Sequence, residues 1–219
     1  MTLHQIQRRI AKLERYQALN AVKVSTPGVP GWMRNGGAPP ADVPCTDPVE
    51  FSHYAFGHDH WGVQKDILRS VVMNLRTAVK ACHASGKTFC AAAAVLHWIT
   101  ANPDGIAITT APTWMQVERV LWGEVHRALQ HSVLQYPPPH KTKLELGPNR
   151  YALGLSTNEG VRFQGWHGKI LIVIDEAPGV LAEIYDAIEG IRAGGDVHVL
   201  ALGNPLIVSG PFYEAPPVN

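Results

Sequence analysis

The sequence has only three cysteines, Cys45, Cys82 and Cys90, and almost no net charge. An odd number of cysteines outside any paired motif excludes a disulfide framework and indicates a reducing, cytosolic environment. The 19 lysines and arginines against 18 aspartates and glutamates leave a charge of +1, which excludes a uniformly basic nucleic-acid-binding coat but not a local basic patch. No apolar run approaches the roughly 18 residues that a membrane-spanning helix needs, so we expect no membrane association.

Charged residues make up 17% of the 219 positions and hydrophobic residues 46%, which is a globular composition. Within residues 1–50, apolar side chains recur at near-helical spacing over 2–22, and prolines and glycines crowd 25–48. We therefore predict an N-terminal helix and a Pro/Gly-rich linker or arm. Residues 51–219 are then expected to form the folded domain.

Strand-like and helix-like segments alternate through the folded domain. This order predicts an α/β fold with a mainly parallel sheet and flanking helices on both faces. Around Gly147-Pro148-Asn149, two alternating segments give a hairpin signal. Strands are expected at 75–81, 105–111, 143–146, 151–156, 169–174 and 197–202, and helices at 61–71, 88–100, 113–131 and 177–191.

The segment between the first strand and the alanine-rich helix matches a phosphate-binding loop. It follows the G-x-x-x-x-G-K-[ST] pattern with alanine in place of the first glycine, and reads Ala81-Cys82-His83-Ala84-Ser85-Gly86-Lys87-Thr88. In such a loop the backbone N–H groups surround phosphate oxygens, Lys87 supplies a positive charge, and Thr88 offers a hydroxyl to Mg²⁺. A pattern with few fixed positions also arises by chance, and alanine at 81 weakens it.

A buried strand over 169–174 ends in two carboxylates, Asp175 and Glu176. A parallel sheet delivers both to the edge where the phosphate loop lies. Asp175 can then hold Mg²⁺, and Glu176 can polarise a water molecule against the γ-phosphate. The alternative is that both merely stabilise the N-terminus of the next helix. A phosphate loop upstream of five apolar residues and an Asp-Glu pair favours an ATP hydrolase.

Two further segments have functional and structural interpretations. Gln64 can read an adenine edge through its amide, or it is a surface glutamine of a helix. Gly203-Asn204-Pro205 follows a buried strand, where an amide can contact the γ-phosphate, or it is a simple turn. The histidines at 53, 58 and 60 lie close to Cys45 in sequence, but their spacing matches no standard zinc pattern.

Taken in order, these segments resemble the ATPase domain of phage large terminases, the DNA-packaging motors of tailed phages. The resemblance extends from about residue 54 to 213, and it includes a phosphate loop whose first glycine is commonly replaced in that family. The segments that carry it are 61–68, 80–88, 109–117, 163–177 and 203–213.

The resemblance implies a RecA-like, additional-strand P-loop ATPase fold, with a further strand between the loop strand and the acidic strand. It implies ATP and Mg²⁺ as cofactors, and ATP-driven movement of double-stranded DNA into a procapsid in the host cytoplasm. The implied partners are a portal protein, a small terminase subunit and further copies of the chain in a ring. By position it assigns adenine reading to Gln64, phosphate binding to 81–88, metal binding to Thr88 and Asp175, water activation to Glu176, and coupling to Gly203, Asn204 and Pro205.

The sequence departs from the family in two respects. The family often has an arginine early in the phosphate loop, where this chain has Lys80 and His83. Arg150, Arg162 and Arg192 are therefore the candidates for stabilising the transferring phosphoryl group. The family's C-terminal nuclease domain would lie beyond Asn219, so we expect ATPase but no nuclease activity from this chain. Two alternatives stay open, namely another P-loop motor of the helicase type and a nucleotide-binding module without turnover.

Overall fold

A six-stranded sheet organises the chain in the computed structural model, which describes residues 30–34, 37–156, 168–192, 195–205 and 210–214. The strand order is β1-β6-β5-β2-β4-β3, and only β3 runs antiparallel to its neighbour. β6 therefore lies between β1 and β5, where the additional strand was expected. The strands are β1 (Arg76–Lys80), β2 (Gly105–Ala111), β3 (Lys143–Gly147), β4 (Arg150–Ser156), β5 (Lys169–Ile174) and β6 (Asp196–Gly203).

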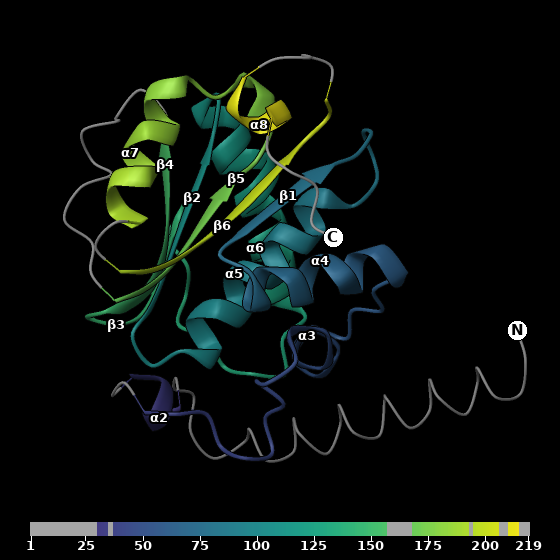
Figure 1. The fold of residues 1–219 in the computed structure, drawn as a ribbon. Helices are drawn as coiled ribbons and strands as arrows, with labels where there is room; N and C mark the ends of the chain where they lie inside the picture. The colour runs from purple at the N-terminus through teal and green to yellow at the C-terminus, as the bar shows by residue number, and fades with distance from the viewer. Residues whose placement is uncertain (1–29, 35–36, 157–167, 193–194, 206–209, 215–219) are drawn as a thin grey trace, which may run out of the picture.

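Helices cover both faces of this sheet (Figure 1). One face packs against α3 (Pro48–Phe56), α4 (Gly62–Met73), α5 (Lys87–Ala101) and α6 (Trp122–Gln130), and the other against α7 (Ala182–Arg192) and α8 (Pro211–Glu214). β5 supplies both cores, because Leu171 and Val173 join the first and Ile170, Ile172 and Ile174 join the second. A strand buried on both faces has a continuous apolar sequence, which is why β5 was predicted correctly.

The parallel register aligns the strand ends. Lys80 lies opposite Gly203, and Thr110 lies opposite Ile174. The last residues of β1, β6, β5, β2 and β4 therefore share one edge of the sheet, called here the carboxyl edge, and the first residues of the same strands form the amino edge. Loops that leave the carboxyl edge meet in space however far apart they are in sequence.

One predicted helix is interrupted, and another contains a π-helical turn. The segment predicted as one helix over 177–191 is a 3₁₀ turn, η4 (Ala177–Gly179), followed by α7, because Val180 is extended at φ −84° and ψ 136°. Pro178 and Gly179 disfavour a continuous α-helix here. The segment predicted as a helix over 113–131 is helical from 114 to 130, but it contains a π-helical turn, η2 (Gln116–Leu121), that leads directly into α6.

Part of the Pro/Gly-rich stretch belongs to the main body. Residues 31–34 form the short helix α2 (Gly31–Arg34), and Met33 and Val43 are buried in the core with α3 and α5. The stretch expected to be an extended linker therefore contains at least two residues, Met33 and Val43, that pack into the core. The predicted helix over 2–22 lies outside the described residues, and the division at residue 50 stays a prediction. None of the helices that the structure describes is both long enough and apolar enough to span a bilayer.

Candidate nucleotide site

The phosphate-loop sequence connects β1 to α5 at the carboxyl edge, in the strand–loop–helix context that the motif requires. Gly86 has φ +80°, a left-handed conformation that glycine adopts without strain, and α5 begins at the next residue. The first turn of α5 thus directs its N–H groups toward the loop, as an anion-binding site needs.

Lys87 is 7% exposed, and its Nζ donates to two carbonyl oxygens of the loop, Ala81 O at 3.1 Å and Cys82 O at 2.7 Å. Ser85 Oγ donates to the same Cys82 oxygen at 2.9 Å. The lysine charge is therefore held inside the concave side of the loop, where phosphate oxygens would replace the carbonyls as its partners.

Asp175 is brought to the start of α5 by the sheet. Its carboxylate accepts a hydrogen bond from Thr88 Oγ1 at 3.1 Å, although 87 residues separate the two positions. The backbone N–H of Glu176 donates to the other Asp175 carboxylate oxygen at 3.1 Å. The backbone N–H of Asp175 donates to Thr110 O at 2.9 Å. The Asp175 side chain is 2% exposed, and burial raises its pKa, while the bonds from Thr88 and Glu176 act to lower it.

Two oxygen ligands at this position suit Mg²⁺. This ion keeps several water molecules and usually takes one or two protein oxygens together with substrate phosphates. The Thr88 hydroxyl and the Asp175 carboxylate, already in contact, form such a pair. Elsewhere in the described ranges, no three His, Cys, Asp or Glu side chains are grouped so that they could hold a metal ion.

Backbone strain is concentrated at the same site. Among the described residues, only Ala84 and Glu176 have positive φ without being glycine, at 58° and 49°. Left-handed backbone costs about 1 kcal/mol or more for such residues and persists where the surrounding structure imposes it. At Glu176 this conformation follows directly on β5 and leaves the side chain half-buried beside Asp175.

Gly203 connects the predicted coupling segment to the phosphate loop. Its carbonyl oxygen accepts the Ala81 N–H at 3.1 Å. A Cβ built on Gly203 would lie 2.3 Å from Pro178 Cδ, so only glycine allows the loop after β5 to pack this closely on β6. Asn204 and Pro205 follow, half-buried, between the ends of β1 and β5. Gly203 therefore ends β6 in contact with the loop, and its role in coupling stays a prediction.

Gln64 is also adjacent to the loop. Its side chain is buried at 8% exposure, and its Oε1 accepts the Trp61 N–H at 3.3 Å, which caps the start of α4. Its Nε2 lies 2.4 Å from the position that a Cβ at Gly86 would occupy. The alternative of an exposed helix glutamine is wrong, and the amide is near the place where a nucleotide on the loop would lie.

The arginine candidates lie elsewhere. Arg150 begins β4 at the amino edge, is 1% exposed, and donates through Nε to Ile99 O at 2.6 Å and through Nη1 to Gly37 O at 3.0 Å. Arg192 ends α7 and pairs with Glu189 at 2.7 Å. Neither faces the loop within one chain, and Arg162 lies outside the described residues.

Sequence reasoning missed several contacts that shape this site. Lys80 Nζ donates to Tyr213 O at 2.6 Å and lies 5.3 Å from the centre of that ring, which ties α8 to the end of β1. A Cβ on Gly179 would lie 2.8 Å from Pro112 Cγ, so the loops after β5 and β2 also pack closely. Prolines and glycines at the strand ends indicated that the loops could pack closely. The sequence does not show which glycine packs against which proline.

A mainly parallel sheet with a phosphate loop after β1, a carboxylate pair after β5 and β6 between these strands is the RecA-like P-loop fold. Among solved structures, the ATPase domain of the large terminase of Thermus phage P74-26 is similar, with 20% identity and a TM-score of 0.51 over 75% of this chain and 72% of that chain. An arginine-to-alanine mutant of that domain is similar with a TM-score of 0.52, at the same identity and coverage. Comparison with protein-family models finds no match, and neither does comparison with curated proteins. At this identity the likeness establishes a shared fold, as the sequence resemblance implied.

Proposed function

We propose that this protein hydrolyses ATP with Mg²⁺ at the carboxyl edge of its sheet. The observation that carries the proposal is the hydrogen bond of Thr88 to Asp175, which joins the phosphate-loop motif to the acidic motif in one site. Two motifs that meet in this manner are much less expected by chance than either alone.

Each residue then has a defined task. The N–H groups of residues 81–88 and the Lys87 ammonium bind the phosphates, and Gln64 reads the adenine. Thr88 and Asp175 would hold Mg²⁺, which would supply positive charge to offset the charge that develops on the phosphates. Glu176 orients the attacking water and accepts its proton, for which a half-buried carboxylate is suited. Gly203, Asn204 and Pro205 connect this site to β1 and couple hydrolysis to movement.

We further propose that hydrolysis drives movement of double-stranded DNA into a procapsid, by a ring of these chains on a portal protein with a small terminase subunit. Support comes from the terminase-like order of the motifs and from the fold shared with a phage terminase ATPase domain.

The test is phosphate release from Mg-ATP by the wild type and by Glu176→Gln, with double-stranded and single-stranded DNA. We expect turnover by the wild type that double-stranded DNA increases, and a variant that binds ATP but loses at least about 100-fold in turnover, as expected when a proton acceptor is removed. Stimulation by single-stranded DNA alone would indicate a helicase-type motor. ATP binding without turnover in both proteins would leave a nucleotide-binding module.

A further inference from the structure

The first turn of α5 lacks the usual cap of a helix N-terminus. Its N-cap residue is Gly86, which has no side chain, so no side-chain hydrogen bond caps the turn among the residues that the structure describes. A site that leaves these N–H groups free for phosphate oxygens needs other contacts to hold the turn. Thr88 contacts Asp175, and the next residue, Phe89, is contacted by the segment that follows α3.

Two histidine rings of that segment pack on the Phe89 ring. The ring centroid of His58 lies 4.3 Å from that of Phe89, and the centroid of His60 lies 5.0 Å from it. The two imidazoles meet each other edge to face, with centroids 5.8 Å apart. Both follow Gly57, whose left-handed φ of 69° ends α3. The segment after α3 therefore forms an aromatic surface against the first turn of α5.

One buried hydroxyl connects these two rings. Ser52 in α3 is fully buried, and its Oγ lies 2.9 Å from His60 Nε2 and 3.1 Å from His58 Nδ1. A serine hydroxyl has one proton, so it donates to one ring and accepts an N–H from the other. Ordering a side chain costs rotamer freedom, and a shared partner restricts both rings together. The placement of both rings on Phe89 therefore depends on Ser52.

We propose that Ser52 is a positioning residue for the nucleotide site, because it fixes the two imidazole rings that hold Phe89 and thereby the first turn of α5. The turn is then held in place for the phosphates by contacts that leave its N–H groups free. The proposal deepens the proposed function and rests on it as far as ATP is concerned. The contacts themselves exist without nucleotide, so the two proposals can fail separately.

The experiment compares Ser52→Ala with Ser70→Ala in the full chain. Ser70 is a matched control, because it is also a buried serine in a helix whose hydroxyl bonds two side chains. Its partners are Thr77 Oγ1 at 2.9 Å and Asn74 Nδ2 at 3.1 Å. These partners lie at or before the start of β1, whereas the phosphate loop follows the end of that strand. Both variants therefore lose a buried hydroxyl with two bonds, but only one of them loses it beside Phe89.

Two quantities separate positioning from general stability. The first is the hydrogen-exchange rate of the Cys90 N–H without nucleotide, because this group bonds Gly86 O at 3.1 Å and closes the first turn of α5. The second is the dissociation constant for Mg-ATP. We expect exchange to become about 3- to 10-fold faster, and the dissociation constant to rise by a similar factor, in Ser52→Ala. Both should change less than twofold in Ser70→Ala, although thermal unfolding should show a similar loss of stability in the two variants.

Phe89→Leu shows whether Ser52 acts through the Phe89 ring. This change removes the surface on which both imidazoles pack and leaves Ser52 in place. In the Phe89→Leu background, Ser52→Ala should then alter Cys90 exchange and ATP affinity less than twofold further, because the two residues act along one route. Fully additive effects would exclude that route, and equal Cys90 exchange in Ser52→Ala and Ser70→Ala would overturn the proposal.

Failure of the proposed function gives a different result. If exchange follows the expected pattern but the wild type binds no ATP, the proposed function fails and the positioning role stands. If the wild type binds ATP and Ser52→Ala changes neither quantity, the positioning role fails alone. If Ser52→Ala does not fold, Phe89→Leu by itself must accelerate Cys90 exchange, and an unchanged rate would refute the proposal.

Discussion

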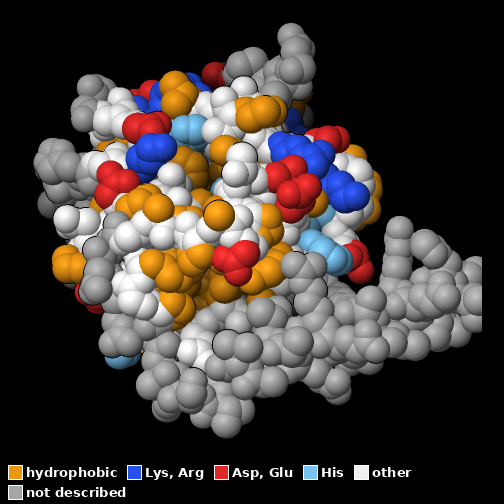
Figure 2. Space-filling view, turned by 90° about the horizontal axis from the view of Figure 1, so that it is seen from below, with side chains coloured by type: hydrophobic (Ala, Val, Ile, Leu, Met, Phe, Trp, Pro, Cys, Tyr) orange, Lys and Arg blue, Asp and Glu red, His pale blue; other side chains and the backbone are white. Residues whose placement is uncertain are grey.

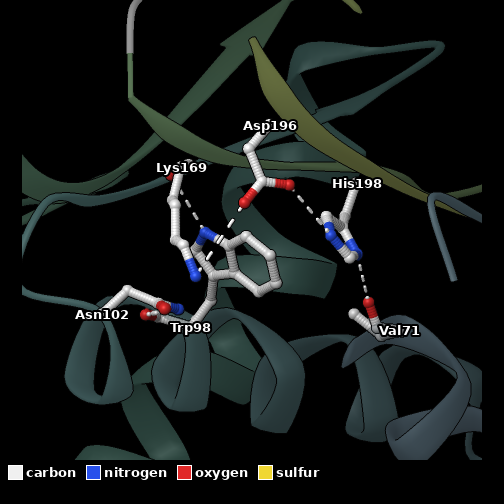
Figure 3. Close-up of polar contacts among 6 residues, drawn as sticks. All are labelled: Val71, Trp98, Asn102, Lys169, Asp196 and His198. Carbon is white, nitrogen blue, oxygen red and sulfur yellow. Dashed lines mark hydrogen bonds and ion pairs between the residues drawn. The ribbon is translucent and has the colours of Figure 1, made fainter. Parts of the chain in front are cut away.

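The two edges of the sheet differ in how their charged side chains are paired. At the amino edge, charged and polar side chains are paired with each other (Figure 3): Asp196 contacts Lys169 at 3.9 Å and His198 at 3.3 Å, and the Trp98 indole N–H bonds Lys169 O at 3.1 Å. Figure 2 views this end of the molecule, where red and blue side chains lie next to each other around hydrophobic surface. A cavity of about 190 Å³ opens beside these residues.

At the carboxyl edge, by contrast, the charged side chains of Lys87 and Asp175 are hydrogen-bonded to neutral groups. Asp175 is buried with only neutral donors in direct contact, Lys87 is bonded to carbonyl oxygens, and the backbone is strained at Ala84 and Glu176. Buried polar networks stabilise when their charges are matched and store unfavourable energy when they are not. We expect such a difference if the carboxyl edge receives a charged ligand, as proposed, and the amino edge does not.

The largest effect that this comparison predicts is on nucleotide binding. Lys87→Ala should weaken binding of Mg-ATP by about 100-fold or more, because it removes the buried charge that faces the phosphates. Lys169→Ala at the amino edge removes a half-exposed lysine, and should change ATP affinity less than twofold. Isothermal titration calorimetry measures both, and similar losses in the two variants would remove the distinction between the edges.

The next largest effect is on stability at the amino edge. The Arg150 guanidinium is buried between carbonyls of Ile99, Thr100, Trp32 and Gly37, so it links α2 and the C-terminal end of α5. Arg150→Met should lower the free energy of unfolding by about 2–4 kcal/mol, since several buried carbonyls lose their donor. Urea denaturation measures this loss, and a change below about 0.5 kcal/mol would show that the buried arginine is not a structural link.

A smaller effect concerns the contact of β6 with the loop after β5. Gly203→Ala should cost about 1–3 kcal/mol, because its Cβ would overlap Pro178, and it should also slow ATP turnover by shifting the carbonyl that holds Ala81. The matched control is Gly190→Ala in α7, where a Cβ meets nothing within 4 Å and should add about 0.5–1 kcal/mol of stability. Thermal unfolding of the two variants should therefore shift in opposite directions.

The smallest predicted effect is a gain in stability when Asp175 is replaced. Because burial raises the folded-state pKa of Asp175, the native state binds its proton more tightly than the unfolded state does, and stability falls as the pH rises through that raised pKa. Without Mg²⁺, Asp175→Asn should therefore add about 1 kcal/mol at pH 7. The gain should vanish as the pH falls below 3.8, the ordinary value for this group, where both forms are neutral. Asp196→Asn should show no such gain, and equal behaviour of the two variants would contradict the assignment of strain to the carboxyl edge.

The sequence predicted the parts of this structure that local patterns determine. β2 and β5 have the predicted bounds, and for β5 the reason is its continuous apolar run. The motif segment connects a strand to a helix, as expected. The helix predicted over 177–191 is confirmed only from Ala182 onward, because its hydrophobic periodicity did not reveal the break at Pro178 and Gly179. Local signals define elements well but define their interruptions poorly.

What the sequence did not reveal depends on register and packing. Arg150 was a candidate for the phosphoryl group until the parallel pairing of β4 with β2 placed it at the far edge of the sheet. Gln64 had two interpretations until the packing of α4 placed it against Gly86. In each case the residue type was informative, and the long-range contact decided its use.

The most direct test of the central claim is a crystal structure of the chain with Mg²⁺ and a non-hydrolysable ATP analogue. The account predicts phosphates against the N–H groups of 81–88 and the Lys87 ammonium, with the metal held by Thr88 and Asp175. A nucleotide bound elsewhere, or phosphates at the carboxyl edge without contact to Lys87, would contradict it.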